Sequence, residues 1–345
     1  MLVTLAADRK RLAEIHRKIS ESDAVDAYQY PVLTLPNEII FEIFTNVLPP
    51  YPECAPYLGL QSPLNLTHIC RKWRQIALAT PQLWRALLLG PANVRHDLQD
   101  VWLHRSGCCP LSIVVADEYT PDQTVYRGGE FLEAILPHRS RLEYLRLASV
   151  GLFSPPIQGS WPSLRHLDLD LDYRVHFDFS DAPLLRSVCL ELVTAASVEL
   201  PWTQLTSLRM HTIRFDQCIP ILQRTTNIVR CELDLQVDSE VDNIMVVSGA
   251  SVALPHLKSL RLSVGSDDVS TTDCLSFLDL PALSNLEFDE ELLSPDPIGS
   301  LRSLISRSCC KLDRVRVGGI RSVVDESYQA VFPSIIFTFI SPAAA

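Results

Sequence analysis

Two hydrophobic patterns follow one another along the chain, and they predict different elements. Before about residue 90, apolar residues recur every three or four positions, as they do on one face of a helix. Beyond residue 140, apolar residues recur in the order Leu-x-x-Leu-x-Leu, which is typical of short strands with one buried face. The patterns divide the chain into a helical part and a repetitive part.

Residues 33–90 contain three helix starts, each a hydroxyl residue followed within two positions by proline. The first start is Thr34 to Glu38, and Pro49-Pro50 ends its helix. The second is Ser62-Pro63, whose apolar stripe continues through Trp73 to Ala77. The third, Thr80-Pro81, leads into Leu83-Trp84 and Leu87-Leu88-Leu89. We predict three short helices with more apolar surface than they cover among themselves, so part of it needs a partner.

The repetitive part contains eight copies of the strand template, which begin 20 to 29 residues apart. A repeat of this period is typical of a solenoid, in which stacked units close a shared core. The sequence therefore predicts an α+β protein: an N-terminal three-helix unit, then an α/β leucine-rich-repeat solenoid with a parallel sheet. The template residues are Leu142-Leu145-Leu147, Leu164-Leu167-Leu169, Leu185-Val188-Leu190, Leu205-Leu208-Met210, Ile228-Cys231-Leu233, Leu257-Leu260-Leu262, Leu283-Leu286-Phe288 and Leu312-Val315-Val317.

Other segments complete the domain prediction. Residues 1–32 form an N-terminal helix and linker, in which Leu5, Leu12, Ile15 and Ile19 make a short stripe. That helix either leads into the first domain or serves dimerisation or docking. Residues 33–90 form the helical domain, 91–140 a connecting helix and an irregular first repeat, 141–330 the repeats and 331–345 an apolar tail. Return segments such as 195–205 are too short for a full helix, whereas 298–308 has room for one.

Charge and composition narrow the class of protein. Hydrophobic residues make up 47% of the chain and charged residues 21%, and no apolar run reaches the length of a membrane helix. Residues 141–345 carry 17 basic and 26 acidic side chains, nine of the eleven excess negative charges. An acidic surface repels phosphate backbones and anionic lipid, so we expect protein partners, no nucleic acid and no membrane.

The ten cysteines are scattered, form no C-x-x-C pair and follow no signal peptide. We interpret them as reduced, mostly buried residues of a cytoplasmic or nuclear protein.

No catalytic or metal-binding motif is present, so the sequence predicts a protein that is not an enzyme and needs no cofactor or metal. Asp168, Asp170 and Asp172 alternate with leucines and share the solvent side of one strand. We interpret them chiefly as a solvated face, with partner contact or a metal site as alternatives.

The same alternation defines a charged surface on the open face of the predicted solenoid, the face that such proteins use for recognition. We expect this face to bind a target protein. Its candidate residues are Arg146, His166, Asp168, Asp170, Glu191, Arg209, His211, Arg230, Glu232, Asp234, Arg261, Glu287 and Asp289.

Residues 33–85 resemble an F-box of the type abundant in fungi. The resemblance lies in Leu35-Pro36-Asn37-Glu38-Ile39 with Ile43-Phe44, in Ile69-Cys70-Arg71-Lys72-Trp73-Arg74-Gln75-Ile76-Ala77 and in Leu83-Trp84. It implies docking onto the S-phase-kinase-associated adaptor of a cullin-RING (SCF) ubiquitin ligase, with the repeats selecting the target. The insert 51–61 is longer than the usual loop of the family. The residues that would face the adaptor are Leu35, Pro36, Ile39, Ile40, Ile43, Phe44, Leu66, Ile69, Cys70 and Trp73, although some of them could close the local core.

Two hypotheses of function follow. In the first, the protein is the substrate-recognition subunit of an SCF ubiquitin ligase. In the second, it is an interaction scaffold outside any ligase, and the F-box helices cap the solenoid. Burial of Ile40, Ile43 and Phe44 by the first repeats would favour the scaffold hypothesis.

Overall fold

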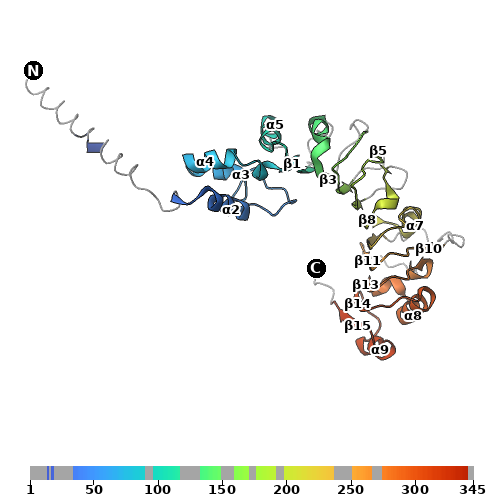
Figure 1. Cartoon of the computed structure of the whole chain (residues 1–345). Helices are drawn as coiled ribbons and strands as arrows, with labels where there is room; N and C mark the ends of the chain where they lie inside the picture. The colour runs from blue at the N-terminus through green and yellow to red at the C-terminus, as the bar shows by residue number, and fades with distance from the viewer. Residues whose placement is uncertain are drawn as a thin grey trace, which may run out of the picture.

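A computed structural model describes residues 14, 17–18, 34–89, 96–116, 133–148, 159–170, 176–191, 198–236, 251–265 and 274–340. Figure 1 shows helices at one end and a long series of strands that follows the inner side of a curve. Helices α7 (Phe215–Arg224) and α8 (Pro297–Ser308) lie on the outer side of this curve. The predicted stripe 5–19, the linker 21–30 and residues 341–345 of the predicted tail lie largely or wholly outside the described residues.

The N-terminal end, which we call the head (residues 34–85), consists of short helices. They are α2 (Asn37–Val47), α3 (Pro63–Ile69), α4 (Arg71–Leu78) and the 3-10 turn η2 (Pro81–Trp84). The second predicted helix is thus two helices. Cys70 has an extended backbone, and its sulfur accepts a hydrogen bond from the Trp73 N–H at 3.4 Å, which caps the start of α4.

The third predicted helix is wrong beyond Trp84. The turn η2 ends there, and Ala86–Leu89 form strand β1, which pairs in parallel with β2 (Leu111–Ala116). Leu87 and Leu89 of β1 are buried in the core, whereas Leu88 is half-buried. This alternation is that of a strand with one buried face. The sheet therefore begins directly after the head.

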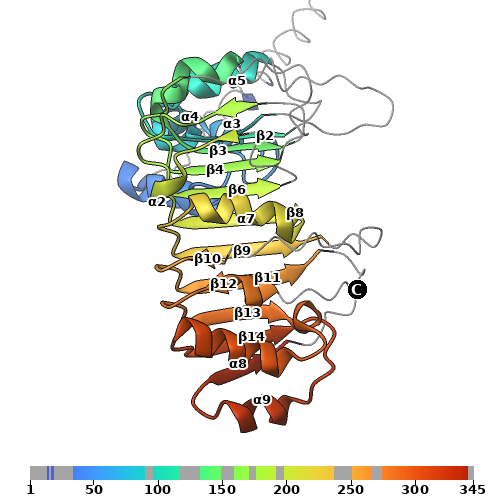
Figure 2. The same cartoon turned by 90° about the vertical axis from the view of Figure 1, so that its right-hand side faces the viewer.

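Among the described residues, eleven strands form one sheet in which all neighbours are parallel. Figure 2 shows the central strands stacked in chain order. Each copy of the predicted template lies on one strand, with its first leucine on or just before it. The strands after β2 are β3 (Leu142–Ala148), β4 (His166–Asp170), β6 (Ser187–Glu191), β8 (Ser207–Ile213), β9 (Arg230–Leu235), β11 (Ser259–Val264), β13 (Asn285–Asp289), β14 (Arg314–Gly318) and β15 (Ile336–Phe339).

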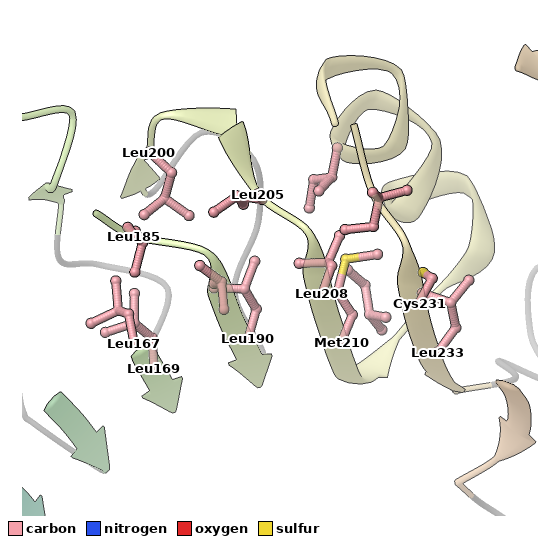
Figure 3. Packing of buried hydrophobic residues seen from close by; sticks show 14 of the residues in the cluster. Leu167, Leu169, Leu185, Leu190, Leu200, Leu205, Leu208, Met210, Cys231 and Leu233 are labelled. Atoms are coloured by element: carbon pink, nitrogen blue, oxygen red, sulfur yellow. The ribbon is translucent and has the colours of Figure 1, made fainter. Parts of the chain in front are cut away.

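The template residues build the core because they lie on the same side of every strand. Leu167, Leu169, Leu190 and Leu208 are 2% exposed or less. Figure 3 shows them facing the return segments, from which Leu200 points back towards the sheet. Burying a leucine side chain stabilises a fold by about 1.5–3 kcal/mol, so repetition of this pattern stabilises the whole sheet.

The return segments differ along the sheet, as their lengths predict. Between β4 and β8 the described residues of these segments, 176–186 and 198–206, contain the short paired strands β5 (Phe177–Asp178) and β7 (Val198–Glu199) and the turn η4 (Trp202–Gln204). Full helices occur as α7 and α8. The remaining elements are α5 (His96–Arg105), η3 (Leu136–Arg141), β10 (Val252–Ala253), η5 (Cys274–Phe277), β12 (Leu278–Asp279), η6 (Glu290–Leu293) and α9 (Asp325–Val331).

The last strand falls within the segment that the sequence pattern assigns to an apolar tail. Residues 336–339 form β15, which pairs with β14. Tyr328 of α9 packs on Phe337 and Phe339, with ring centroids 5.4 and 6.0 Å away. The core thus continues to residue 339.

Candidate functional site

The residues that the F-box resemblance assigns to the adaptor lie in two layers of the head. Ile40, Phe44 and Leu66 are almost fully buried. Phe44 packs edge-on against Trp73 of α4, with ring centroids 5.0 Å apart, and the Trp84 indole N–H donates to the Ala77 carbonyl at 2.9 Å. These buried side chains form the core of the head, and no free surface is left on them for a partner.

The other residues of that set remain accessible. Ile39 on α2 is 42% exposed and Ile69 at the end of α3 is 58% exposed, while Pro36 is also exposed. Leu35, Ile43, Cys70 and Trp73 are half-buried. Leu78, which the sequence pattern did not single out, is 39% exposed. The head therefore presents several apolar side chains to solvent around its own closed core.

The insert 51–61 joins the head to the sheet. The Tyr51 hydroxyl donates to Glu143 Oε2 at 3.0 Å, and the Arg85 guanidinium lies 3.9 Å from the centroid of the Tyr51 ring. Ser112 Oγ on β2 donates to the Pro52 carbonyl at 2.6 Å. Burial and the hydrogen bond to Glu143 raise the pKa of Tyr51, so this hydroxyl stays protonated. The first half of the insert is thus a structural joint.

The second half of the insert is exposed. Leu58 is 78% exposed and Leu60 is 88% exposed, on either side of Gly59, whose φ of +103° favours glycine. The sequence could have indicated this exposed pair, because the two leucines flank a glycine within a proline-rich loop.

The predicted target-binding residues lie on the strands, on the side opposite the buried leucines. The strand register arranges them in three rows that cross the sheet. The first row contains His166 and Arg230, the latter exposed. The second row contains Arg146, Asp168, Arg209, Glu232, Arg261 and Glu287. The register places Asp170, Glu191 and His211 in the third row. The register shifts between β8 and β9 after Met210, and contacts rather than register place Asp234 beside His211 and Asp289 beside β11.

The charges of the second row pair with one another from strand to strand. The distances between Arg Nε and carboxylate oxygen are 3.4 Å for Arg146–Asp168, 3.1 Å for Arg209–Glu232 and 3.4 Å for Arg261–Glu287. Arg316 on β14 reaches the other oxygen of Glu287 at 3.3 Å. This row is a nearly neutral ladder, so it adds little net field to the surface.

The third row keeps its negative charge, because no arginine or lysine lies in it among the described strands. His211 Nδ1 lies 3.6 Å from Asp234, and Asp289 accepts the Val264 N–H at 3.0 Å. Partial burial raises the pKa of Asp170, and the neighbouring Glu191 raises it further. Partial burial also raises the pKa of Asp168 and Asp289, and in Asp168 it outweighs the opposing effect of Arg146.

An aromatic group adjoins the first row at the end near the head. Tyr144 stacks on His166 with ring centroids 4.3 Å apart, and Tyr51 meets Tyr144 edge-on at 5.4 Å. Burial lowers the pKa of His166. Aromatic side chains with polar tips are frequent in the energetic centre of protein interfaces.

Within the described residues, no group of three His, Cys, Asp or Glu side chains is placed to hold a metal ion, and no helix is long and apolar enough to cross a membrane. Each of the ten cysteines is free. Cys218, Cys231, Cys274 and Cys310 are buried, while Cys108 and Cys309 are exposed. Burial raises the pKa of Cys54 to about 11 and that of Cys231 to about 12, which keeps both as thiols.

Residues 32–89 match the family model of F-box-like domains. The match covers the whole head and continues into β1, so the domain and the sheet share this strand. No curated protein matches the chain closely enough to count as a relative. The chain thus carries an F-box-like domain followed by a large parallel sheet.

Proposed function

We propose that this protein is the substrate-recognition subunit of an SCF-type ubiquitin ligase. F-box domains generally bind the S-phase-kinase-associated adaptor of these complexes, and residues 32–89 match that domain. The observation that carries the proposal is the exposure of Ile39 and Ile69 on a head whose own core is already closed. Exposed Ile39 and half-buried Ile43 on α2, together with exposed Ile69 on α3, provide apolar contacts for the adaptor, through which the protein joins the cullin and RING subunits.

The second part of this proposal concerns the face of the sheet that carries the three rows of side chains. We propose that the sheet is a leucine-rich-repeat solenoid and that its open face binds a protein. The ladder of the second row is neutral, and the third row is acidic. A target that places basic side chains along Asp170, Glu191, Asp234 and Asp289 therefore complements the face, while Tyr144 and His166 offer aromatic contacts near the head.

Adaptor binding by the purified protein tests the first part. The double variant Ile39→Glu, Ile69→Glu places charge on the exposed apolar residues without opening the core, and we expect it to lose adaptor in a pull-down. Ile320→Glu is the matched control, because Ile320 is 65% exposed and lies beyond the last template copy. Equal recovery of adaptor by wild type and the double variant would overturn the proposal.

The scaffold hypothesis has one observation in its favour, since Ile40 and Phe44 are fully buried. Phe44, however, packs against Trp73 of the head itself, and Ile43 stays half-buried. In this alternative the head acts as a cap of the sheet through β1 and the insert. The scaffold hypothesis predicts that no adaptor binds to the wild-type protein at any concentration tested.

The proposal also holds that the protein is not an enzyme, requires no cofactor, binds neither nucleic acid nor membrane and works in the cytoplasm or nucleus. The acidic third row supports the exclusion of nucleic acid and anionic lipid as partners of the sheet.

A further inference from the structure

The open face of the sheet carries a basic side over the strands β9, β11, β13 and β14. The register aligns the first row across all four strands and places Arg230 at one end and Arg314 at the other. Both arginines are exposed, and within the described part of the chain neither takes part in an ion pair. One step before this row, exposed Lys258 and Asp313 carry opposite charges and cancel. The first row therefore keeps its positive charge.

The opposite side of the same four strands is acidic. Asp234 on β9 and Asp289 on β13 each lie four residues after the first-row residue of their own strand. Asp234 accepts a hydrogen bond from Ser263 Oγ at 3.2 Å, and Asp289 accepts one from the Val264 N–H at 3.0 Å. A Cβ at Gly318 would lie 2.7 Å from Asp289 Oδ1, so this glycine leaves room for the carboxylate. Strand β11 thus holds both acidic side chains in place.

The second row separates the two charged sides and is neutral over these strands. Glu232 pairs with Arg209 of the neighbouring strand β8. Glu287 pairs with both Arg261 and Arg316. Along the strand direction, the face therefore changes from basic through neutral to acidic.

The width of this charged face fits a helix. The first and third rows lie four residues apart on each strand, which corresponds to about 13 Å. A helix with its side chains is about 10–12 Å wide, so a helix that lies across the strands reaches both rows. Neighbouring strands are about 4.8 Å apart, which places Arg230 about 14 Å from Arg314 and Asp234 about 10 Å from Asp289 along the rows.

The spacing along the rows favours a helix over an extended segment. Aspartate side chains are short, so the spacing of Asp234 and Asp289 is the more exacting one. Helical positions seven apart share one side at about 10.5 Å, close to the spacing of the aspartates. An extended segment repeats on one side about every 6.6 Å, and its nearest multiples miss that spacing by about 3 Å. Helical positions eleven apart are separated by about 16.5 Å, a distance that the long arginine side chains accommodate.

An exposed isoleucine ends the basic row. Ile336 of β15 pairs with Arg314 in the register and is 62% exposed. Solvated charge pairs contribute little binding energy by themselves, whereas an apolar contact at the end of the row adds to it. The partner that fits this face therefore has an apolar side chain beyond its acidic ones.

We propose that a helix of the target protein lies across β9, β11, β13 and β14, with its acidic and basic side chains sorted onto two opposite sides. The acidic side chains contact Arg230 and Arg314. The basic side chains contact Asp234 and Asp289, and an apolar side chain covers Ile336. This inference rests on the proposed function of the open face and specifies the kind of target that the face selects.

Binding of synthetic peptides to the purified full-length protein, measured by fluorescence anisotropy, tests the proposal. The sorted peptide is an alanine-based helix with two glutamates eleven positions apart on one side, a leucine one turn beyond them and two lysines seven positions apart on the opposite side. A scrambled helix of the same composition is the control. We expect the sorted peptide to bind at least about tenfold more tightly than the scrambled one. Equal binding of the two, or no binding of the sorted peptide at about 1 mM, would overturn the proposal.

A protein variant tests which side chains read the sorted charges. Arg230→Glu with Arg314→Glu makes both sides of the face acidic at residues that no ion pair holds in the described structure. We expect this variant to lose at least about tenfold in affinity for the sorted peptide. It should gain affinity for a peptide in which lysines replace the two glutamates. Unchanged preference between these peptides would contradict the proposed contacts.

A matched variant controls for net charge. Arg302→Glu with Lys311→Glu changes the charge of the protein by the same amount at exposed residues outside the three rows. It should keep the wild-type affinity for both peptides, and the same shift in preference as in the Arg230→Glu, Arg314→Glu protein would overturn the proposal. Circular dichroism verifies that both variants are folded.

Proximity labelling in cells separates this inference from the proposed function. We expect the Arg230→Glu, Arg314→Glu variant to lose the target proteins that an Asp170→Arg, Glu191→Arg variant also loses. If only the second variant loses them, the face binds its target in another way and the helix proposal alone fails. If neither variant loses any labelled protein, the proposed target binding by the face fails as well.

Discussion

The head and the central strands of the sheet differ in how completely they bury their apolar residues. In the sheet, Leu169 and Leu208 are fully buried, and each strand repeats that arrangement. In the head, Ile39 and Ile69 remain 42% and 58% exposed beside a core of only a few side chains. A repeating array closes its core with its neighbours, whereas a small helical unit cannot cover all its apolar residues. The comparison locates the surface that is available for a partner.

The largest expected effect is at the contact between Trp84 of the head and Trp102 of α5, next to the start of the sheet. Trp84 is fully buried, and its ring meets Trp102 of α5 edge-on at 5.3 Å, just before β1. Trp84→Ala should lower the free energy of unfolding by about 3–5 kcal/mol because it opens a large cavity between head and sheet. Urea denaturation followed by circular dichroism measures it. Leu60→Ala, at a site 88% exposed, is the control. A loss of stability in Trp84→Ala no larger than that in Leu60→Ala would contradict the packing of Trp84 between head and sheet.

The second prediction compares one apolar residue from each region. Leu208→Ala in the middle of the sheet should cost about 2–5 kcal/mol of stability through lost burial and a cavity. Ile39→Ala on the head should change stability by no more than about 0.5 kcal/mol, because its side chain is already in solvent. Thermal and urea unfolding of both variants measure the difference. Similar losses for the two would remove the distinction between a closed and an open apolar surface.

The third prediction concerns the charge ladder of the sheet. A double-mutant cycle of Arg261→Ala and Glu287→Ala should give a coupling energy of about 0.2–1 kcal/mol, because the pair is partly solvated. The coupling should fall as salt is added. Arg302→Ala combined with Glu287→Ala is the control, since Arg302 is exposed and no ion pair joins the two in the described structure. A coupling that does not respond to salt would contradict a solvated ladder.

The smallest effect is expected at the acidic third row. The folded state raises the pKa of Asp170, so the folded protein binds that proton more readily than the unfolded chain does. This contribution to stability is therefore lost as pH rises through the raised pKa. Asp170→Asn should make the protein slightly more stable than wild type at pH 7, and the gain should fade towards pH 4. Melting curves across this range measure it, and a gain that grows at low pH would reverse the assigned sign.

The sequence predicted the strands of the sheet well because each copy of the template specifies both a strand and its buried side. Aligning the copies also places Arg261 beside Glu287, so the ladder could have been inferred from the sequence. The sequence did not reveal β1, because Leu87-Leu88-Leu89 lacks the template and follows a helix-like start at Thr80-Pro81. Periodicity also missed the break at Cys70, which depends on a local cap formed by its sulfur.

The surface of the head was harder to predict. The helical stripe groups Ile39, Ile40, Ile43 and Phe44 together, but only the packing of α2 on α4 separates buried from exposed residues. The role of the insert depends on Tyr51 reaching Glu143, which lies 92 positions away in the chain. Contacts over that separation leave no local pattern, so only the tertiary structure shows them.

The central claim is that the head binds the adaptor and the sheet binds the target, independently of each other. Proximity labelling in cells with the wild type, the Ile39→Glu, Ile69→Glu variant and an Asp170→Arg, Glu191→Arg variant tests it directly. We predict that the head variant loses labelling of the adaptor and keeps the remaining labelled proteins, while the sheet variant keeps the adaptor and loses labelled proteins. Loss of the same proteins by both variants, or adaptor labelling retained by the head variant, would contradict this division.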